Sequence, residues 1–377
     1  MSHLGLANDI LAAARSVTDR HPRLLVFGPV ARGNPYQELL YSDLRSAGIA
    51  AVPALPWTEL AAVTSGVAAG VPTALHLHWT TAITGTADSE QEVANRGAEF
   101  VERLQSWKQD GLRFIWTVHN RLPHGCRFPE AESQFRASLA QQADVIHVMS
   151  QHAPARLGDI YELPQDRVVV LAHPAYDTAY PTYFQREDCR LRLGIDHSAL
   201  VVCALGAMQP YKNLPVLVEG VRRARAMSSR RIQLIVAGDY QPGLDDELDT
   251  TIELLNRDPD AIVDTHRVAD RRMAEYFAAS DLASACYDSP IVSGSSVLAL
   301  SLGCPVLAID GDSARELIGD AGFYVSSASA DAIAEVLNGL DASATTNARH
   351  ATQARRDAIS ATDIAKGFTR AVNHLLA

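Results

Sequence analysis

The 377-residue chain has neither an excess of basic residues nor a long apolar run. Its 33 lysines and arginines stand against 44 aspartates and glutamates, and the net charge of −11 excludes a broad basic surface for nucleic acid. Any anion site must therefore be small and concentrated. No stretch approaches about 18 uninterrupted apolar residues, and residues 1–22 lack a basic region followed by an apolar segment. We therefore predict a cytoplasmic protein.

Cysteine is scarce and shows no disulfide or metal-binding pattern. The five cysteines are scattered without CxxC spacing, at Cys126, Cys189, Cys203, Cys286 and Cys304. Because three of them lie in apolar, strand-like runs, we interpret the set as reduced core residues. No HxxxH or mixed histidine and cysteine spacing occurs, so the sequence predicts no metal site.

Short apolar runs alternate with amphipathic stretches along the chain. One series of runs begins at Leu24, Ile49, Thr73, Arg113, Asp144 and Arg167, and a second begins at Ala199, Arg231, Ala261, Leu282 and Cys304. Such alternation is typical of a parallel sheet covered by helices. The segment NPYQELLYSDLRSAG, residues 34–48, is predicted to form the first crossover helix. Two successive series predict two Rossmann-like domains.

The division between the domains is predicted near residue 178. Prolines and tyrosines in HPAYDTAYPTY, residues 173–183, break both the helical and the strand periodicity, as expected of a connector. We expect domains at residues 1–178 and 179–358. Residues 359–377 are helical in pattern, and whether this helix returns to the first domain is left open by periodicity alone.

The segment SGSSVLALSLGCPVLAID, residues 293–310, places small polar residues directly before an apolar helix. At the carboxyl ends of parallel strands, loops meet helix N-termini whose N–H groups and dipole favour an anion. The small residues that would line such a phosphate site are Ser293, Gly294, Ser295 and Ser296. The structural alternative is that Ser295 or Ser296 only caps the helix and Gly294 only forms the turn.

A lysine supports the phosphate interpretation. In VVCALGAMQPYKN the first strand of the second series ends at Gly206, and Lys212 and Asn213 follow shortly before a helix. The helix dipole disfavours a cation there, which favours a functional reason over a solvated surface lysine.

The first domain places different side chains at its strand ends. GPVARGNPY follows the first strand and is not a GxGxxG dinucleotide fingerprint. Two later motifs, HLHW and TVHNRLPHG, are rich in histidine and end apolar runs. We predict that these histidines line a cleft, although for an isolated histidine a structural role is the usual alternative.

Together these motifs resemble a two-domain glycosyltransferase of the GT-B type, in particular family 4 and its relatives. Gly206 and Lys212 match the glycine and lysine of the family's Gly-Arg-x4-Lys loop, and Gly303 and Pro305 match its Gly-x-Pro segment. The resemblance implies an α/β fold with two Rossmann-like domains that face each other across a cleft. Residues 1–178 would then form the acceptor side and residues 179–358 the nucleotide-sugar donor side.

The chain departs from the family pattern at three positions. Ala207 stands where the family has arginine, and Pro290 and Leu298 replace the two glutamates of its Glu-x7-Glu motif. The Ser-Gly-Ser loop in their place resembles a subgroup of bacterial polysaccharide-assembly enzymes. The usual contacts to the donor sugar and ribose must therefore differ.

The resemblance implies roles for individual residues. His119 would be the catalytic residue that faces the transferred sugar. The donor nucleotide or its diphosphate would contact Gly206, Lys212, Asn213, Ser293, Gly294, Ser295, Ser296 and Glu316, with Glu316 on the nucleotide. The acceptor side or cleft would include Arg32, Gly33, Asn34, Tyr36, His78, Trp79, Asn120, His124, His173 and Tyr176. Retention or inversion stays open, and further candidate bases are Asp144, Asp43 and Glu38.

The implied activity is metal-independent transfer of a hexose-type sugar from a UDP or GDP sugar to a saccharide or lipid-linked saccharide. No cofactor is implied beyond this co-substrate, and a lipid-linked acceptor would involve the inner face of a membrane. Two alternatives are a nucleotide-sugar epimerase on the same architecture and a non-catalytic two-lobed sugar-binding protein.

Overall fold

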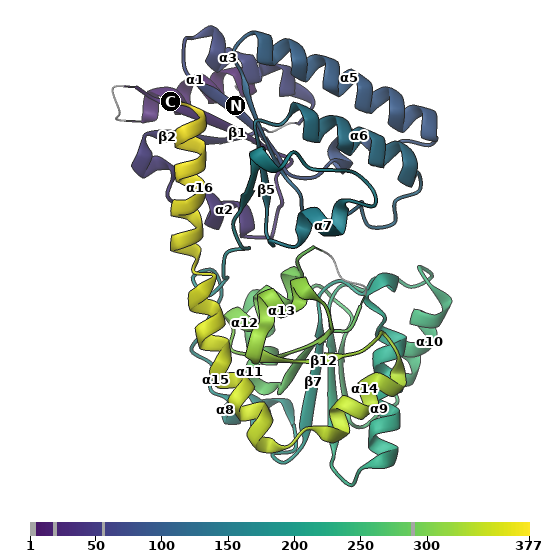
Figure 1. Cartoon of the computed structure of the whole chain (residues 1–377). Helices are drawn as coiled ribbons and strands as arrows, with labels where there is room; N and C mark the ends of the chain where they lie inside the picture. Colours follow the sequence, from purple (N-terminus) through teal and green to yellow (C-terminus); the bar gives the residue numbers. More distant parts are fainter. Residues whose placement is uncertain (1–4, 18–20, 55–56, 288–290) are drawn as a thin grey trace. The chain divides into compact units, whose positions relative to one another are not determined.

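The computed structural model describes residues 5–17, 21–54, 57–287 and 291–377, which form two compact units (Figure 1). The first unit comprises Met1–Pro174 together with Ala361–Ala377, and the second comprises Ala175–Ser360. The chain therefore leaves the first unit after Pro174 and re-enters it at Ala361.

The first unit is built on a parallel sheet that has six strands among the described residues, in the order β2-β1-β3-β4-β5-β6. Its strands are β1 (Arg23–Gly28), β2 (Ile49–Pro53), β3 (Thr73–Leu77), β4 (Arg113–Thr117), β5 (Val145–Val148) and β6 (Val168–Val170). Its α-helices are α1 (Leu6–Ser16), α2 (Tyr36–Tyr41), α3 (Thr64–Ala68), α4 (Thr81–Thr84), α5 (Glu90–Gln109), α6 (Pro129–Gln142), α7 (Ala153–Leu157) and α16 (Ala361–Leu375). Short 3₁₀ turns are η1 (Leu44–Ala47), η2 (Trp57–Val63) and η3 (Gln165–Arg167).

The second unit repeats this plan with strands in the order β12-β11-β10-β7-β8-β9. Its strands are β7 (Leu200–Leu205), β8 (Ile232–Ala237), β9 (Ala261–Asp264), β10 (Leu282–Ala285), β11 (Val306–Ile309) and β12 (Gly322–Val325). Its α-helices are α8 (Arg186–Leu193), α9 (Leu214–Met227), α10 (Asp246–Leu255), α11 (Asp270–Ala279), α12 (Gly294–Ser301), α13 (Asp312–Ile318), α14 (Ala330–Gly339) and α15 (Ala342–Ala358). Its 3₁₀ turns are η4 (Pro210–Lys212) and η5 (Gly319–Ala321).

Both faces of the second sheet are buried, which explains its continuous apolar strands. In β7, Val201 and Cys203 face one core cluster with α11 and α12, whereas Leu200 and Val202 face another with α9, α10 and α14. Side chains of successive strand residues point to opposite faces, so a strand covered on both sides is predominantly apolar. The helices on both sides of this sheet are visible in Figure 1.

The tail of the chain is divided between the two units. Helix α15 packs against α12 and η5 of the second unit, and α16 packs against α2 and η1 of the first. Buried apolar residues of α16, among them Ile364, Phe368 and Val372, cover the first unit. The terminal helix is thus an integral part of the first unit's core.

Two local expectations were wrong. The segment 34–48 forms α2 and η1 with a break at Ser42 and Asp43, instead of one helix. Strand β12 was not predicted. It has only four residues, two of them aromatic, and so short a segment shows no recognisable hydrophobic periodicity. It adds an edge strand beside β11.

Four of the cysteines, Cys189, Cys203, Cys286 and Cys304, are buried, and all five are free thiols. None of the described helices has the length and apolar character needed to cross a membrane.

Candidate functional site

The strand order of the second sheet reverses between β7 and β10. From β7 the chain proceeds to β8 and β9 on one side, and β10 then returns to the other side of β7. In parallel α/β sheets, ligands bind at the carboxyl ends of strands beside such a reversal. The loop after β7 carries Gly206 and Lys212, and the chain after β10 leads to Ser293 at the start of α12.

Lys212 lies over the glycine that ends β7. Gly206 has a φ of 105°, which favours glycine, and a Cβ atom on it would lie 2.8 Å from Lys212 Nζ and displace the ammonium from its present position. Burial lowers the pKa of Lys212 from 10.5 to about 8, and among the described residues no acidic side chain offsets this effect. A desolvated lysine without a carboxylate partner is well suited to bind an anionic ligand.

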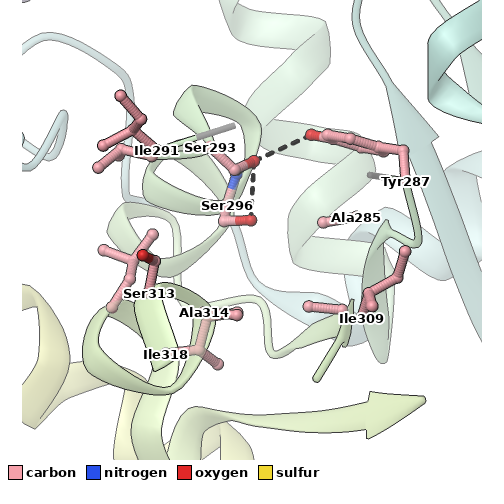
Figure 2. Close-up of a pocket in the computed structure, with 12 residues that line it drawn as sticks. Ala285, Tyr287, Ile291, Ser293, Ser296, Ile309, Ser313, Ala314 and Ile318 are labelled. Atoms are coloured by element: carbon pink, nitrogen blue, oxygen red, sulfur yellow. Dashed lines mark hydrogen bonds between the residues drawn. The ribbon is translucent and has the colours of Figure 1, made fainter. Parts of the chain in front are cut away.

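The N-terminus of α12 is organised by hydroxyl groups. Ser293 caps the helix, since its Oγ accepts a hydrogen bond from the backbone N–H of Ser296 at 3.2 Å. The Ser293 Oγ also lies 2.9 Å from the hydroxyls of both Tyr287 and Ser296 (Figure 2). Tyr287 thereby holds the first turn of α12 in place.

Two cavities adjoin this helix start. One, of about 360 Å³, is lined by Tyr287, Ile291, Ser293, Ser296 and residues of α13, as Figure 2 shows. The other is lined on its polar side by Gly206, Gln209, Lys212, Ser284 and Tyr287. Because Tyr287 lines both cavities, the lysine side and the serine side of this edge share one wall.

The other predicted donor residues occupy different positions around this edge. Asn213 caps α9 with a positive φ of 53°, and Ser295 borders a small void beside Cys203 and Phe277. Gly294 is exposed and has no atom near the position of a Cβ. Glu316 lies on α13, and its backbone carbonyl accepts a hydrogen bond from Arg355.

The positions that depart from the Glu-x7-Glu pattern contain no replacement acid. Leu298 is half-buried and packs against the core beneath α12, and Ala207 is exposed. Pro290 lies outside the described residues. Among the described residues, the polar groups at this edge include hydroxyls, backbone N–H groups, the Gln209 amide and Lys212.

The first unit gathers a hydrogen-bonded chain of side chains at the carboxyl end of its sheet. We call this set the relay. In order, its members are His119, His78, Tyr41, His76, Thr117, His147 and the Leu171 carbonyl.

The outer half of the relay begins at His119. His119 Nε2 lies 3.1 Å from His78 Nδ1, and His78 Nε2 lies 2.5 Å from the Tyr41 hydroxyl. His119 is half-buried, whereas His78 is only 2% exposed. This differs from the prediction that His78 lines a cleft: it lies in the core, and its polar atoms are satisfied by neighbouring side chains.

The inner half runs through three neighbouring strands. His76 Nδ1 lies 2.8 Å from the Tyr41 hydroxyl, and its Nε2 lies 2.7 Å from Thr117 Oγ1. Thr117 Oγ1 is 3.0 Å from His147 Nδ1, and His147 Nε2 is 2.9 Å from the Leu171 carbonyl oxygen. Polar side chains inside buried strands satisfy one another here, as burial requires.

Burial keeps the four relay histidines uncharged. It lowers the pKa of His76, His78 and His119 well below 6.5, and repulsion between the histidines lowers these values further. Burial likewise lowers the pKa of His147 to about 4. All four imidazoles are therefore neutral near pH 7.

Aromatic rings enclose the outer end of the relay. The indole of Trp79 stacks on the His119 ring with centroids 4.4 Å apart, and Tyr36 meets the same ring edge-on at 5.2 Å. His173 packs against Tyr36 at 4.8 Å and is buried. Phe368 of α16 stacks on His76 at 5.2 Å, so the terminal helix also supports the relay.

A buried ion pair fixes the loop that follows His119. Arg136 Nε bonds the Glu132 carboxylate at 2.9 Å, and the side chains of both residues are less than 5% exposed. Arg136 Nη1 donates to the carbonyls of Asn120 at 2.8 Å and Arg121 at 3.2 Å. Thr80 donates its hydroxyl proton to the same carboxylate. Neither Arg136 nor Glu132 was singled out from the sequence.

The remaining predicted acceptor-side residues do not form one group. Arg32, Gly33, Asn34 and His124 are exposed, and the side chain of Asn120 accepts a long hydrogen bond from Arg136. Tyr176 belongs to the second unit, where its backbone N–H donates to Ser301 Oγ.

The other candidate bases have structural roles or lie on the surface. Asp144 is not suited to be a base, because it lies before β5 and its carboxylate binds Lys108 and the backbone N–H of Phe114. Asp43 accepts a hydrogen bond from Ser46, and Glu38 is exposed on α2.

His76 of HLHW was predicted to line a cleft but is fully buried, and the sequence also held a signal for the relay members Thr117 and His147. His76, Thr117 and His147 are polar residues within strands that are otherwise apolar. A polar side chain in a fully buried strand needs partners, so three such residues in neighbouring strands indicate a network. Tyr41 carried no comparable signal, because tyrosine is common at partly buried helix positions.

Comparison with known proteins gives a family match within the second unit. Residues 199–341 match the family model of Glycosyl transferases group 1. A D-inositol 3-phosphate glycosyltransferase from Gordonia bronchialis is 30% identical over 191 residues. That alignment covers 48% of this chain and 41% of the relative, so the matched part spans less than half of that protein.

Solved structures resemble nearly the whole chain. Anabaena HepE in complex with UDP and glucose has a TM-score of 0.68 at 15% identity, covering 94% of this chain and all of that one. Sucrose-phosphate synthase from Thermosynechococcus elongatus has a TM-score of 0.70 at 15% identity, covering 94% and 99%. The predicted fold of two Rossmann-like domains of the GT-B type is confirmed. The region that matches the Glycosyl transferases group 1 model, residues 199–341, lies within the second of these domains.

Proposed function

We propose that the protein is a glycosyltransferase that moves a sugar from a nucleoside-diphosphate sugar to a hydroxyl of an acceptor. The observation that carries the proposal is Lys212, a half-buried, desolvated lysine beside the serine-capped start of α12 that has no acidic partner among the described residues. Both features lie at the strand reversal of the domain that matches Glycosyl transferases group 1.

The donor diphosphate would be bound by Lys212 and by the first turn of α12. The backbone N–H groups of this turn and the helix dipole favour negative charge, and glycine and serine let a phosphate approach closely. In glycosyl transfer, negative charge develops on the leaving diphosphate as its bond to the anomeric carbon breaks. Groups already aimed at that charge lower the barrier without reorganisation.

This arrangement supports metal-independent chemistry, in which a lysine and a helix N-terminus provide the positive potential. Within the part of the chain that the structure describes, no cluster of three or more potential metal ligands occurs. The proposed donor is a UDP sugar, because Anabaena HepE, which shares the fold, was solved with UDP and glucose. We propose a hexose as the transferred sugar on the same ground.

The first unit would supply the acceptor side. His119 is its proposed catalytic residue, enclosed by Trp79 and Tyr36 and held by the relay. A neutral imidazole can accept a hydrogen bond from a sugar hydroxyl, and aromatic rings provide apolar faces for a sugar ring. A saccharide or a lipid-linked saccharide is the proposed acceptor, and a site in the cytoplasm at the membrane's inner face would suit the latter.

The first experiment is a thermal-shift screen with UDP, GDP and their glucose and mannose derivatives in EDTA. A ligand that binds only the folded state raises Tm, by an amount set by its concentration relative to Kd. We expect UDP and UDP-glucose to raise Tm and uridine to have little effect. Absence of a shift with every diphosphate would refute the proposal.

A second experiment separates transfer from the alternatives. With the preferred donor alone, we expect slow release of nucleoside diphosphate, and an added acceptor should accelerate it. Isomerisation of the donor sugar without an acceptor would instead identify an epimerase. Binding of the donor without any turnover would identify a non-catalytic sugar-binding protein.

A further inference from the structure

The inner end of the relay sets the direction of its hydrogen bonds. A backbone carbonyl only accepts, so His147 Nε2 must donate its hydrogen to Leu171. A neutral imidazole has one N–H group, which leaves His147 Nδ1 as an acceptor. The partner of that nitrogen is Thr117, whose hydroxyl must therefore donate to it.

The donor and acceptor atoms of the remaining relay members are assigned in the same way. The Thr117 hydroxyl has a single hydrogen, which His147 receives, so Thr117 accepts from His76 Nε2–H. His76 Nδ1 must then accept, and the Tyr41 hydroxyl donates to it. Tyr41 in turn accepts from Nε2–H of the next histidine. Each step follows from the count of hydrogens on the preceding group.

At the outer end the direction determines the state of His119. His78 donates through Nε2 to Tyr41, so its Nδ1 accepts from His119 Nε2–H. His119 then has its hydrogen on Nε2 and a lone pair on Nδ1. The relay contains one carbonyl and no carboxylate, so it provides no base at its inner end to receive a proton. Its effect is therefore to orient His119, not to conduct protons.

This assignment of hydrogens holds only if each relay imidazole is neutral. The groups around His119 favour its neutral form. The charged or titratable groups that act on the pKa of His119 are His78, His147, His173 and Arg136, and all lower it. None of them is an acid, so protonation of His119 gains no compensating contact from them.

We propose that the relay fixes His119 in the Nε2–H tautomer, so that its Nδ1 serves as a hydrogen-bond acceptor for a sugar hydroxyl. Tyr41, His76, Thr117 and His147 are then positioning residues that act through His78. The role of the hydroxyl rests on the proposed function, whereas the tautomer is a property of the protein alone. A histidine held as an acceptor selects a ligand group that donates, such as a hydroxyl, over a carbonyl or phosphate oxygen.

The direct test is long-range ¹H–¹⁵N correlation spectroscopy on the full chain with ring-labelled histidine, without ligand at neutral pH. The four relay histidines should show Nε2–H with unprotonated Nδ1. His173 is an internal contrast, because its Nδ1 lies 2.9 Å from the Pro174 carbonyl and must carry the hydrogen. Assignment of His119 as the Nδ1–H tautomer or as an imidazolium would overturn the proposal.

Two variants test the origin of this state. Tyr41→Phe and Thr117→Val each remove one hydroxyl of the relay, and His119 should then show a mixture of tautomers. Thr251→Val is the matched control, since Thr251 is also buried and its hydroxyl bonds only the Glu247 carbonyl in α10. An unchanged His119 tautomer in both relay variants would show that the relay does not determine it.

The kinetic readout depends on the proposed function. Tyr41→Phe should lower kcat about tenfold and leave KM for the donor within about twofold, because positioning acts on the reacting geometry. A purely structural role would lower Tm and leave kcat per folded molecule unchanged. If no donor is turned over by the unmodified protein, the proposed function fails and the tautomer measurement still stands.

Discussion

The carboxyl ends of the two sheets use opposite kinds of polar groups. In the second unit, Lys212 is half-buried and desolvated, no acidic partner for it occurs among the described residues, and hydroxyl groups organise the start of α12. In the first unit, His119 and its neighbours are neutral and satisfy one another through a closed series of hydrogen bonds. At the edge of the second unit, the positive charge of Lys212 is available to an anionic ligand. At the edge of the first unit, the side chains are neutral and their hydrogen bonds have fixed directions.

Under the proposed function, this difference reflects what each edge would bind. A diphosphate carries charge, and a desolvated cation gains its missing partner when the ligand arrives. A sugar hydroxyl carries no charge, so recognition depends on the direction of donors and acceptors instead of on potential. The same architecture thus provides an electrostatic site in one unit and a directional site in the other.

The largest effect on stability is expected for Arg136→Ala in the first unit. It leaves the buried Glu132 carboxylate without its partner, which costs about 3–5 kcal/mol in the free energy of unfolding. Chemical denaturation should show this loss. Arg103→Ala breaks an exposed arginine–glutamate pair of the same helical spacing and should leave stability nearly unchanged.

Arg136→Lys distinguishes the contribution of this residue to folding from its role in positioning the loop after His119. A lysine can still pair with Glu132 but cannot also reach the carbonyls of Asn120 and Arg121. We expect a folded variant with reduced turnover. Full activity in this variant would show that the loop after His119 does not depend on the guanidinium.

The largest effect on binding is expected for Lys212→Ala in the second unit. Removal of the unpaired ammonium should weaken UDP binding about hundredfold, which corresponds to about 2.7 kcal/mol. Binding of uridine should hardly change, because uridine has no phosphate. Calorimetry with both ligands measures the contrast, and equal losses would contradict the assignment of Lys212 to the diphosphate.

Binding of UDP should also depend on pH in a defined direction. Burial lowers the pKa of Lys212 to about 8, so the free protein loses this charge as the pH rises through 8. Affinity for UDP should be constant from pH 7 to 7.5 and about tenfold weaker at pH 9. In Lys212→Arg, any remaining affinity should not change over this range, because arginine stays charged.

The same shift affects the stability of the unliganded protein with the opposite sign. Between about pH 8 and 10 the folded state binds fewer protons at Lys212 than the unfolded state does, so stability gains from rising pH. Saturating UDP should reduce this gain, because the anion restores the ordinary pKa. Thermal unfolding with and without UDP at pH 7.5 and 9.5 measures both effects.

The smallest effects are expected at Ser293. Ser293→Asp keeps a good helix cap but adds a negative charge, so stability should be retained while UDP binding weakens about tenfold. Ser293→Ala should lower stability by about 1 kcal/mol through loss of the cap. Ser329→Asp, at the cap of α14, is the control for the added charge. A similar loss of affinity in that variant would show a general charge effect.

Much of the fold was predictable because its signals are local. Apolar runs such as those at Leu24 and Leu200 indicated parallel strands, and the Gly206 and Lys212 pair indicated the edge at which a ligand binds. Strand β12 and the division of residues 34–48 into α2 and η1 were not predicted. The conformations of these short segments depend on contacts with neighbouring elements. The residue pattern of one segment does not show those contacts.

The candidate site was predictable only in part for the same reason. Strand ends identified His119, Lys212 and Ser293, because a residue that ends a parallel strand lies at the binding edge. The relay was missed because its members come from α2 and three strands, and His78 was assigned to a cleft although it lies in the core. The directions of its hydrogen bonds depend on distances across strands.

The sequence by itself determined the two parallel sheets, the position of Lys212 and Ser293 after strand ends, and the small residues at the start of α12. Periodicity and strand ends encode these properties within segments of a few residues. Tertiary structure alone decided that Lys212 is desolvated with no acidic partner among the described residues, and that a carbonyl at Leu171 orients His119 through five side chains. Desolvation and hydrogen-bond direction depend on groups brought together from distant parts of the chain, and only the folded chain brings them into contact.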